Sequence, residues 1–281
     1  MSGGTAPSQS RRRSEPAVLA DILGRLAIES GYVVEFGAWD GVHLSNSRDL
    51  IARGWRGLLI EADAQKFAAL KANVTAPGVT LVNARVETSG ENALEAILAR
   101  AGAPQTPDLL SIDIDSDDLA VWMSLKTFRA RVVIIEYNVT VPFDIDFVNP
   151  KGRNWGNGAL TIWKFARARD YRLVAFAGMN LVFVDKALAE AAGIAEIALD
   201  ARHADSAPRY FWGYDGTLLT NGGAPEVLNV PWHSYAFAQP VPRFLRRWHL
   251  GGEWKFAERV VSALSMLLTR PILFLKRITR R

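Results

Sequence analysis

The sequence predicts a doubly wound α/β fold, in which helices cover both faces of a mostly parallel β-sheet. Two observations predict this class: short apolar runs alternate with stretches of helical periodicity, and the first run ends in a glycine-containing turn at 37–41. Strands separated by helices are joined by right-handed crossovers and form a parallel sheet. The composition agrees, because 49% of the 281 residues are hydrophobic and supply material for a large core.

The expected elements start with a helix at 16–29. Apolar residues recur there at helical spacing from Val18 to Leu26, and Pro16 is tolerated in a first turn. Each strand that follows is short and apolar, as is typical of strands buried on both faces. We expect these strands at 32–36, 57–61, 79–83, 109–113 and 132–137, with helices between them at 45–53, 64–73, 92–101 and 117–127.

The pattern changes after the fifth strand. The stretch 139–157 contains Pro142 and Pro150 and is long for a connection, so we interpret it as a substrate loop or lid. A helix is expected at 158–169, and strands at 171–176 and 180–185 form an antiparallel hairpin. The expected organisation is a flexible tail at 1–15, one α/β domain at 16–190, an irregular extension packing on the core at 191–252 and a basic amphipathic helix at 253–281.

Composition and charge restrict the function. The chain has no cysteine, which excludes disulfides, thiolate zinc sites and cysteine nucleophiles and agrees with a cytoplasmic location. The net charge of +4 is unevenly distributed, since residues 243–281 hold many basic residues against only Glu253 and Glu258. The rest of the chain is therefore net acidic. A basic face on the folded body is not expected, and neither is a nucleic-acid partner.

The basic tail allows two interpretations. An apolar stripe that includes Val260, Leu264 and Leu268 is accompanied by basic residues toward the end, and a helix of this kind can lie on an anionic membrane surface. Alternatively, the helix packs on the core or in a dimer interface. The longest uncharged apolar run, 260–269, is shorter than the roughly 18 residues of a membrane span. Any membrane contact is therefore expected to be peripheral.

A ligand site is expected where the first two strands end. Gly37 and Gly41 let the backbone turn sharply and approach a bound molecule closely. Glu61 lies about 20 residues later, at the offset of a carboxylate that accepts hydrogen bonds from ribose hydroxyls. Taken singly, the glycines could be turn residues and the acids helix caps. Together they predict a nucleoside site made of Glu35, Gly37, Ala38, Asp40, Gly41, Glu61 and Asp63.

The same turn favours a cationic nucleoside over a dinucleotide. The fingerprint G-x-G-x-x-G is absent, because the spacing after Gly37 is G-x-x-x-G. Glu35 and Asp40 would place negative charge beside a pyrophosphate, whereas S-adenosylmethionine carries an ammonium and a sulfonium group. We therefore expect S-adenosylmethionine as the cofactor. The alternative is NAD, which would make the protein an NAD-dependent oxidoreductase.

Several segments resemble the FkbM-type methyltransferases over about residues 33–185. They are EFGAWDG at 35–41, LIEAD at 59–63, SIDIDSDD at 111–118, VIIEYN at 133–138 and GMNLVFV at 178–184. The resemblance implies a seven-stranded, Rossmann-like methyltransferase sheet with a closing antiparallel strand. It also implies S-adenosylmethionine as methyl donor and O-methylation of a sugar or secondary metabolite. The sequence departs from the family at Ser116 and Asp117, where an acid-glycine pair is usual.

Acidic residues at the ends of the fourth and fifth strands are candidates for catalysis. Methyl transfer needs an aligned nucleophile and a group that removes its proton, and Asp113 or Asp115 is the leading general base, with His43 as a further candidate. Oxygen ligands from adjacent strand ends would also suit Mg²⁺, so Asp115, Glu136 and Asn138 form a candidate metal site. This arrangement resembles that of catechol-type O-methyltransferases.

Two other functions compete with that of a methyltransferase acting on a small-molecule or glycan acceptor. An NAD-dependent oxidoreductase would share the fold and the ribose-binding acid but lacks its glycine fingerprint here. A non-catalytic scaffold on the same fold, attached to membranes by the tail, is the second alternative. The presence of both Glu35 and Glu61 beside the glycine turn favours the enzyme.

Overall fold

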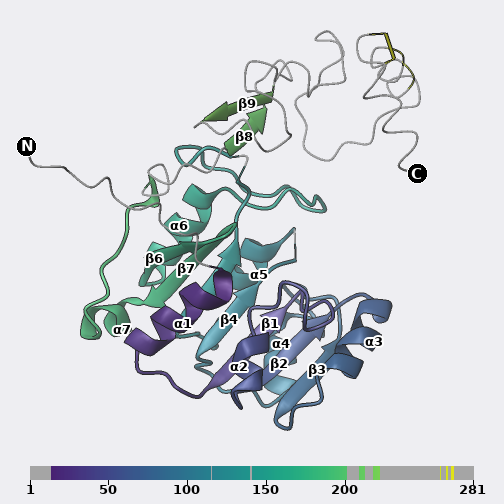
Figure 1. Cartoon of the computed structure of the whole chain (residues 1–281), viewed down its shortest axis with the longest axis vertical. Helices are drawn as coiled ribbons and strands as arrows, with labels where there is room; N and C mark the ends of the chain where they lie inside the picture. The colour runs from purple at the N-terminus through teal and green to yellow at the C-terminus, as the bar shows by residue number, and fades with distance from the viewer. Residues whose placement is uncertain are drawn as a thin grey trace, which may run out of the picture.

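The computed structural model describes residues 14–114, 116–139, 141–200, 209–212 and 218–221, together with Val260, Leu264, Leu267 and Leu268. A central β-sheet carries helices on both of its faces (Figure 1). Of the helices within these residues, none has the length and apolar character needed to cross a membrane. Residues 1–13 of the expected tail and nearly all of the expected helix at 253–281 lie outside the described residues.

Seven strands form one sheet in the order β3-β2-β1-β4-β5-β7-β6. Neighbours among the first five strands are parallel, whereas β7 is antiparallel to both β5 and β6. The doubly wound, Rossmann-like sheet with a closing antiparallel strand is thus confirmed. The strands are β1 (Tyr32–Phe36), β2 (Arg56–Glu61), β3 (Val79–Asn83), β4 (Leu109–Ile112), β5 (Val132–Glu136), β6 (Tyr171–Ala177) and β7 (Asn180–Asp185).

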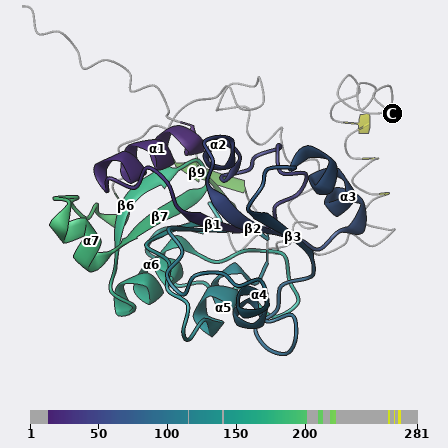
Figure 2. The same cartoon turned by 90° about the horizontal axis from the view of Figure 1, so that it is seen from below.

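Among the described residues, seven helices accompany this sheet. Figure 2 shows α1 and α2 over one face and α4, α5 and α6 over the opposite face. Because α1 precedes β1 and packs antiparallel to it, the first residues of α1 lie at the edge where the parallel strands end. The helices are α1 (Glu15–Arg25), α2 (Arg48–Ala52), α3 (Ala64–Asn73), α4 (Leu94–Arg100), α5 (Asp118–Ser124), α6 (Ala159–Ala168) and α7 (Lys186–Ala191).

Several helices are shorter than the sequence predicted, and the first two show a physical reason. The first was expected to reach residue 29, but it ends at Arg25 because Ala27 adopts a left-handed backbone with φ +54°. The second was expected to begin at residue 45, but it begins at Arg48. Ser45 and Ser47, just before it, direct their hydroxyls to a buried carboxylate instead, and this interaction holds the backbone in a loop.

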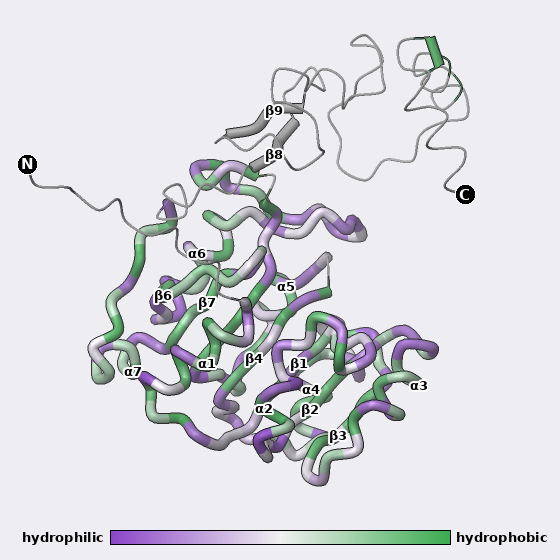
Figure 3. The backbone as a smooth tube through the Cα atoms, in the orientation of Figure 1, coloured by the Kyte–Doolittle hydropathy of each residue, from purple (hydrophilic) through white to green (hydrophobic). Residues whose placement is uncertain are grey.

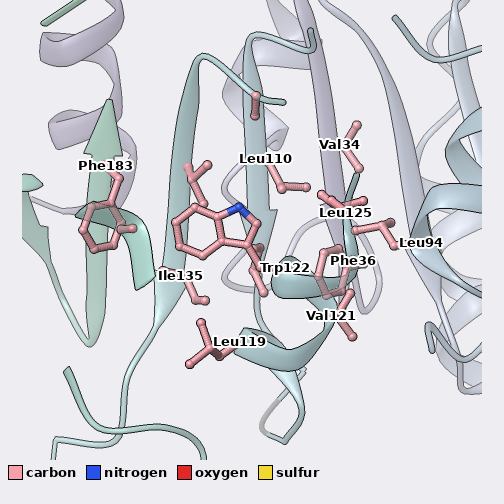
Figure 4. Close-up of a cluster of buried hydrophobic side chains, with 14 of the residues drawn as sticks. Val34, Phe36, Leu94, Leu110, Leu119, Val121, Trp122, Leu125, Ile135 and Phe183 are labelled. Carbon is pink, nitrogen blue, oxygen red and sulfur yellow. The ribbon is translucent and has the colours of Figure 1, made fainter. Parts of the chain in front are cut away.

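The larger hydrophobic core lies between the sheet and helices α4, α5 and α6. Trp122 of α5 is at its centre, with the indole facing strand residues such as Ile135 and Phe183 (Figure 4). The ring centroids of Trp122 and Phe165 are 5.0 Å apart, and those of Trp122 and Tyr171 are 5.5 Å apart, both edge to face. Such pairs add about 0.5–1.5 kcal/mol each to the effect of burial. They connect α5, α6 and β6.

Tyr171 is expected to stabilise this core through one buried hydrogen bond. Its hydroxyl donates to the Ala130 carbonyl oxygen at 2.6 Å, and burial raises the pKa of the phenol from 10.0 to about 12. Tyr171→Phe should lower the free energy of unfolding by about 1–2 kcal/mol, because the carbonyl loses its donor. The folded state holds the proton more tightly, so this contribution is complete below pH 10 and falls as the pH rises toward 12. Urea unfolding of the wild-type protein and Tyr171→Phe at pH 8 and pH 11 measures this contribution. If the two proteins differed in unfolding free energy by the same amount at both pH values, the role of the Tyr171 hydrogen bond would be contradicted.

The opposite face of the sheet packs against α1. Val18 and Leu19 of α1 form one buried cluster with strand residues that include Val33, Leu109 and Val182. Figure 3 shows hydrophobic colour along β4 and β7. Since side chains alternate along a strand, every second residue from these positions also faces α1. Polar residues that continue this alternation at the ends of the strands are therefore brought to the α1 side.

The chain continues beyond the expected domain limit at residue 190. Ile194 is buried in the cluster with α1, and Ile197 and Leu199 pack against the larger core. Further along, β8 (Arg209–Trp212) and β9 (Leu218–Asn221) pair as an antiparallel two-stranded sheet. The sequence had indicated only an irregular extension here, because aromatic residues are scattered among glycine and proline without clear alternation.

Candidate functional site

The sheet has a topological switch point between β1 and β4. The chain runs outward from β1 to β2 and β3, then crosses back to β4 on the other side of β1. Loops that diverge in this way leave a crevice at the carboxyl ends of the two strands, and ligands of open α/β sheets bind there. The turn after β1 and the segment after β4 therefore border the candidate site.

Gly37 is required at this switch point for steric reasons. Its backbone has φ +78°, and a Cβ atom placed on it would overlap the main-chain carbonyl oxygen of Asp113 at the end of β4. The amides of Gly37 and Ala38 both donate to the Ile60 carbonyl oxygen at 3.1 Å. The turn is thus fixed between β2 and β4. Ala38 is buried against Leu59 and Leu70.

Gly41 has a packing role. Its φ is +71°, and a Cβ atom there would lie 2.6 Å from a methyl carbon of Val74 and 2.7 Å from one of Leu70. Gly41 therefore allows the turn to lie directly on α3 and the residue that follows it. The sequence predicted Gly41 as a ligand contact, whereas this geometry accounts for the glycine by contact within the protein.

Glu61, the predicted ribose ligand, is held in one position at the end of β2. It is 7% exposed, and its two carboxylate oxygens accept hydrogen bonds from the Trp39 amide at 2.8 Å and the Asp63 amide at 2.7 Å. Its carbonyl oxygen accepts from the Asn83 side chain. These contacts connect the turn after β1 to the end of β2. Each carboxylate oxygen retains a second lone pair, so Glu61 can still accept bonds from hydroxyl groups.

Asp63 and Asp40 serve the local backbone. Asp63 is the N-cap of α3 and accepts from the amides of Gln65 and Lys66, which lowers the pKa of its carboxyl group. This is the helix-cap role that the sequence had left open for it. Asp40 accepts from the amides of Val42 and His43, and these bonds lower its pKa as well. Both carboxylates therefore order loops at the edge of the site.

An aromatic group covers the outer side of the turn. Trp39 has φ +49° and is 44% exposed; the ring of His43 lies edge-on to it with centroids 4.9 Å apart. The ammonium of Lys66 lies 3.9 Å from the Trp39 ring centroid, a cation–π contact. His43, a predicted catalytic candidate, is exposed here. Its neighbours are Trp39 and the Asp40 loop.

Glu35 lies beneath the loop that leads to α2. It is 4% exposed, and it accepts hydrogen bonds from the hydroxyls of Ser45 and Ser47 at 2.8 and 2.5 Å and from the Asn46 amide at 2.8 Å. Burial raises the pKa of this carboxyl group, and the hydrogen bonds oppose the shift. The predicted contact with a cationic ligand is therefore replaced, for both oxygens, by contacts that hold the loop over the sheet.

The end of β4 is organised by a buried acid at the start of α5. Asp118 is 2% exposed and accepts from the amides of Ile114 and Ser116 at 2.7 and 2.9 Å. These bonds fix the segment after Asp113, which is half-buried beside Gly37. Asp115, predicted as base and metal ligand, lies outside the described residues.

Glu136 is the last residue of β5, the strand beside β4, and Asn138 lies two residues later. Ile112 pairs with Ile135, so Asp113 lies at the level of Glu136, and both continue the alternation that faces α1. Asn138 instead donates its side-chain amide to the Trp155 carbonyl oxygen at 2.6 Å. Within the described part of the chain, no three acidic or histidine side chains come together as a metal site. The Mg²⁺ prediction thus has no support in this geometry.

Comparison with known proteins gives likenesses of fold. No protein-family model matches the chain, and neither does any curated protein. A TehB-like SAM-dependent methyltransferase from Corynebacterium glutamicum is 14% identical with a TM-score of 0.39, over 63% of this chain and 90% of that one. A proposed O-methyltransferase from Klebsiella pneumoniae is 18% identical with a TM-score of 0.42, over 63% and 81%. A SAM-dependent methyltransferase from Aquifex aeolicus is 14% identical with a TM-score of 0.37, over 59% and 86%.

Three polar residues at this edge were missed by the sequence prediction. Asn46 donates to Ser111 at 3.0 Å, and Asn180 donates to Glu15 at 3.1 Å. Glu15 had been assigned to a flexible tail, but it is the first residue of α1 and lies at the carboxyl edge. Only the antiparallel direction of α1 relative to β1 would have indicated this position.

Proposed function

We propose that the protein is an S-adenosylmethionine-dependent methyltransferase that methylates an oxygen atom of a hydroxyl-bearing acceptor. The observation that carries this proposal is Glu61, a buried carboxylate held by two backbone amides next to the Gly37 turn at the switch point. A fixed acceptor at this place suits the two hydroxyls of a ribose. The segments that resemble FkbM-type methyltransferases include both residues, which supports the same nucleoside.

The residues at the edge fit this nucleoside better than a dinucleotide. A Cβ atom at Gly37 would fill the space between the turn and the end of β4. Because glycine has no Cβ, the backbone of the turn lies directly against that strand end. Asp40 and Glu61 place negative charge beside the turn, and no third glycine follows to cradle a pyrophosphate. When bound, S-adenosylmethionine supplies a methyl group activated by a sulfonium. Glu61 would hold its ribose, and Gly37 would lie beside it.

The protein must also take a proton from the acceptor hydroxyl. Asp113 is the described candidate for this base, because it is half-buried at the end of β4 and directly beside the Gly37 turn. Asp115 remains a second candidate, although it lies outside the described residues. Such a carboxylate beside the acceptor hydroxyl orients this nucleophile. It also accepts the hydroxyl proton as the bond between the oxygen and the methyl group forms.

Calorimetric titration of the purified protein tests the proposal without a known acceptor. We expect S-adenosylmethionine and S-adenosylhomocysteine to bind and NAD not to bind. Binding of NAD alone would indicate an oxidoreductase, and binding of none of the three would indicate a scaffold; either result overturns the proposal. Transfer of a labelled methyl group to hydroxylated acceptors is the second step.

A further inference from the structure

The loop between β5 and α6 has a fixed half and an exposed tip. In the fixed half, the Asp146 carboxylate pairs with the Lys164 ammonium of α6 at 2.7 Å. The amide of Phe147 donates to the Thr161 hydroxyl of the same helix at 2.8 Å. The tip, residues 150–156, extends beyond these contacts and is largely exposed. The position of the tip therefore depends on contacts other than those with α6.

Asn149 holds the base of this tip. Its side chain is 7% exposed, and its Nδ2 donates both to Oδ1 of Asp117 at 3.1 Å and to the Arg153 carbonyl oxygen at 2.8 Å. Its Oδ1 accepts from the Trp155 amide at 3.3 Å. The bonds to Arg153 and Trp155 close the tip on itself. The bond to Asp117 attaches the tip to the segment that follows β4.

Asp117 contributes its carboxylate to this bond and not to its own helix. It is the N-cap residue of α5, yet its side chain forms no capping hydrogen bond. An acid at an N-cap ordinarily accepts from amides of the first turn, as Asp63 does at α3. Asp117 instead accepts from Asn149, which lies 32 residues further along the chain. The contact therefore serves the position of the loop.

A continuous series of contacts joins this bond to the cofactor turn. Gly37 lies directly against the main-chain carbonyl oxygen of Asp113. The buried Asp118 carboxylate accepts from the Ile114 amide and from a second amide of the same segment, which fixes the backbone that leads to Asp117. Packed contacts of this kind carry coupling between two sites when the element they join has two arrangements. A ligand bound at the turn would therefore bias the segment that holds the loop tip.

We propose that Asn149 and Asp117 form a latch that couples the loop tip to the cofactor turn, so that a bound nucleoside holds the tip against the segment after β4. The inference rests on the proposed function and adds Asn149 to it as a positioning residue, which acts through the loop. With the latch formed, the tip lies beside the segment that carries the candidate base Asp113. Release of the bond lets the acceptor enter and the product leave.

Amide hydrogen exchange on the full chain tests the latch, with S-adenosylhomocysteine as the probe. The amides of Arg153 and Trp155 report on the tip, because the first donates to the Pro150 carbonyl oxygen and the second to Asn149. We expect saturating S-adenosylhomocysteine to slow their exchange about tenfold in the wild-type protein. Asp117→Ala should abolish this slowing. Calorimetry should show that the variant still binds the probe, with an affinity lowered by no more than the same factor, because coupling is reciprocal.

Two further variants separate the latch from a general loosening of the loop. Asp117→Asn keeps an oxygen that accepts from Asn149, and a neutral acceptor forms a bond about half as strong, so at least about threefold slowing should return. Asp146→Ala is the matched control, because it removes a carboxylate from the same loop that contacts α6 instead of the segment after β4. This variant should keep the slowing of the wild-type protein.

The outcomes distinguish the latch from the proposed function. Full slowing in Asp117→Ala, no slowing in Asp117→Asn, or an equal loss in Asp146→Ala would overturn the latch. If the wild-type protein binds S-adenosylhomocysteine and the exchange of the tip stays the same, the latch alone fails. If the wild-type protein does not bind S-adenosylhomocysteine, the proposed function fails.

Discussion

Gly37→Ala is expected to lower the free energy of unfolding by more than about 4 kcal/mol and to abolish binding of S-adenosylhomocysteine. The added Cβ atom would overlap a main-chain oxygen of Asp113, which a rotamer change cannot move. In addition, φ at this position is +78°, where alanine is strained. The turn would have to leave β4, and the hydrogen bonds of Gly37 and Ala38 to Ile60 would be lost with it.

Two other glycines separate the effect of steric overlap from that of backbone strain. Gly54 has φ +91° and no neighbouring atom within 4 Å of the position that an added methyl group would take, so Gly54→Ala should cost only the backbone strain of about 1–2 kcal/mol. Gly24 lies in α1 with open space around it, and Gly24→Ala should stabilise by about 0.5–1 kcal/mol. Urea unfolding compares the three variants. If Gly37→Ala cost no more than Gly54→Ala, the steric role of Gly37 would be wrong.

The fold was predictable because its signal is repeated along the chain. Each buried strand is an apolar run of four to seven residues, and β1, β3 and β7 begin and end where the runs do. The positions of Gly37 and Glu61 at the ends of β1 and β2 were also predictable, whereas their contact with a ligand stays a prediction. These inferences need only local sequence and the rule that parallel strands end at one edge.

The hydrogen-bond partners of the polar residues were not predictable in the same way. Glu35 was expected to face a ligand, but it accepts from Ser45, Asn46 and Ser47, which only the path of the loop brings above it. Asp118 fixes the backbone at Ile114 and Ser116, a contact that the local sequence does not indicate. One acid can cap a loop or meet a ligand, and tertiary structure decides which.

Residues far apart in the sequence show the same limit. Glu15 and Asn180 meet because α1 runs antiparallel to β1 and β7 enters the sheet in reverse. As a result, Glu15 and Asn180 lie at the carboxyl edge of the sheet, on the same face as Glu136. Periodicity identifies an element but not its direction relative to its neighbours, so the contact between Glu15 and Asn180 had no counterpart in the sequence prediction.

Glu61→Ala is expected to weaken the binding of S-adenosylhomocysteine about 100-fold. A hydrogen bond to a charged group contributes about 1.5–3 kcal/mol, and a ribose offers two hydroxyls, so a total loss near 3 kcal/mol is a conservative value. The variant also removes the acceptors of the Trp39 and Asp63 amides, which loosens the turn after β1. Calorimetry measures the affinity, and thermal unfolding without ligand measures the structural part.

Asp63→Ala is the matched control for this prediction. Asp63 lies two residues away and carries the same charge, but it caps α3 through Gln65 and Lys66. Its removal should cost about 1 kcal/mol of stability, as is typical of a lost N-cap, and leave the affinity nearly unchanged. If the two variants lost affinity equally, the loss would reflect net charge at the edge rather than a ribose contact. If Glu61→Ala kept normal affinity while Asp63→Ala lost it, the ribose contact would belong to Asp63.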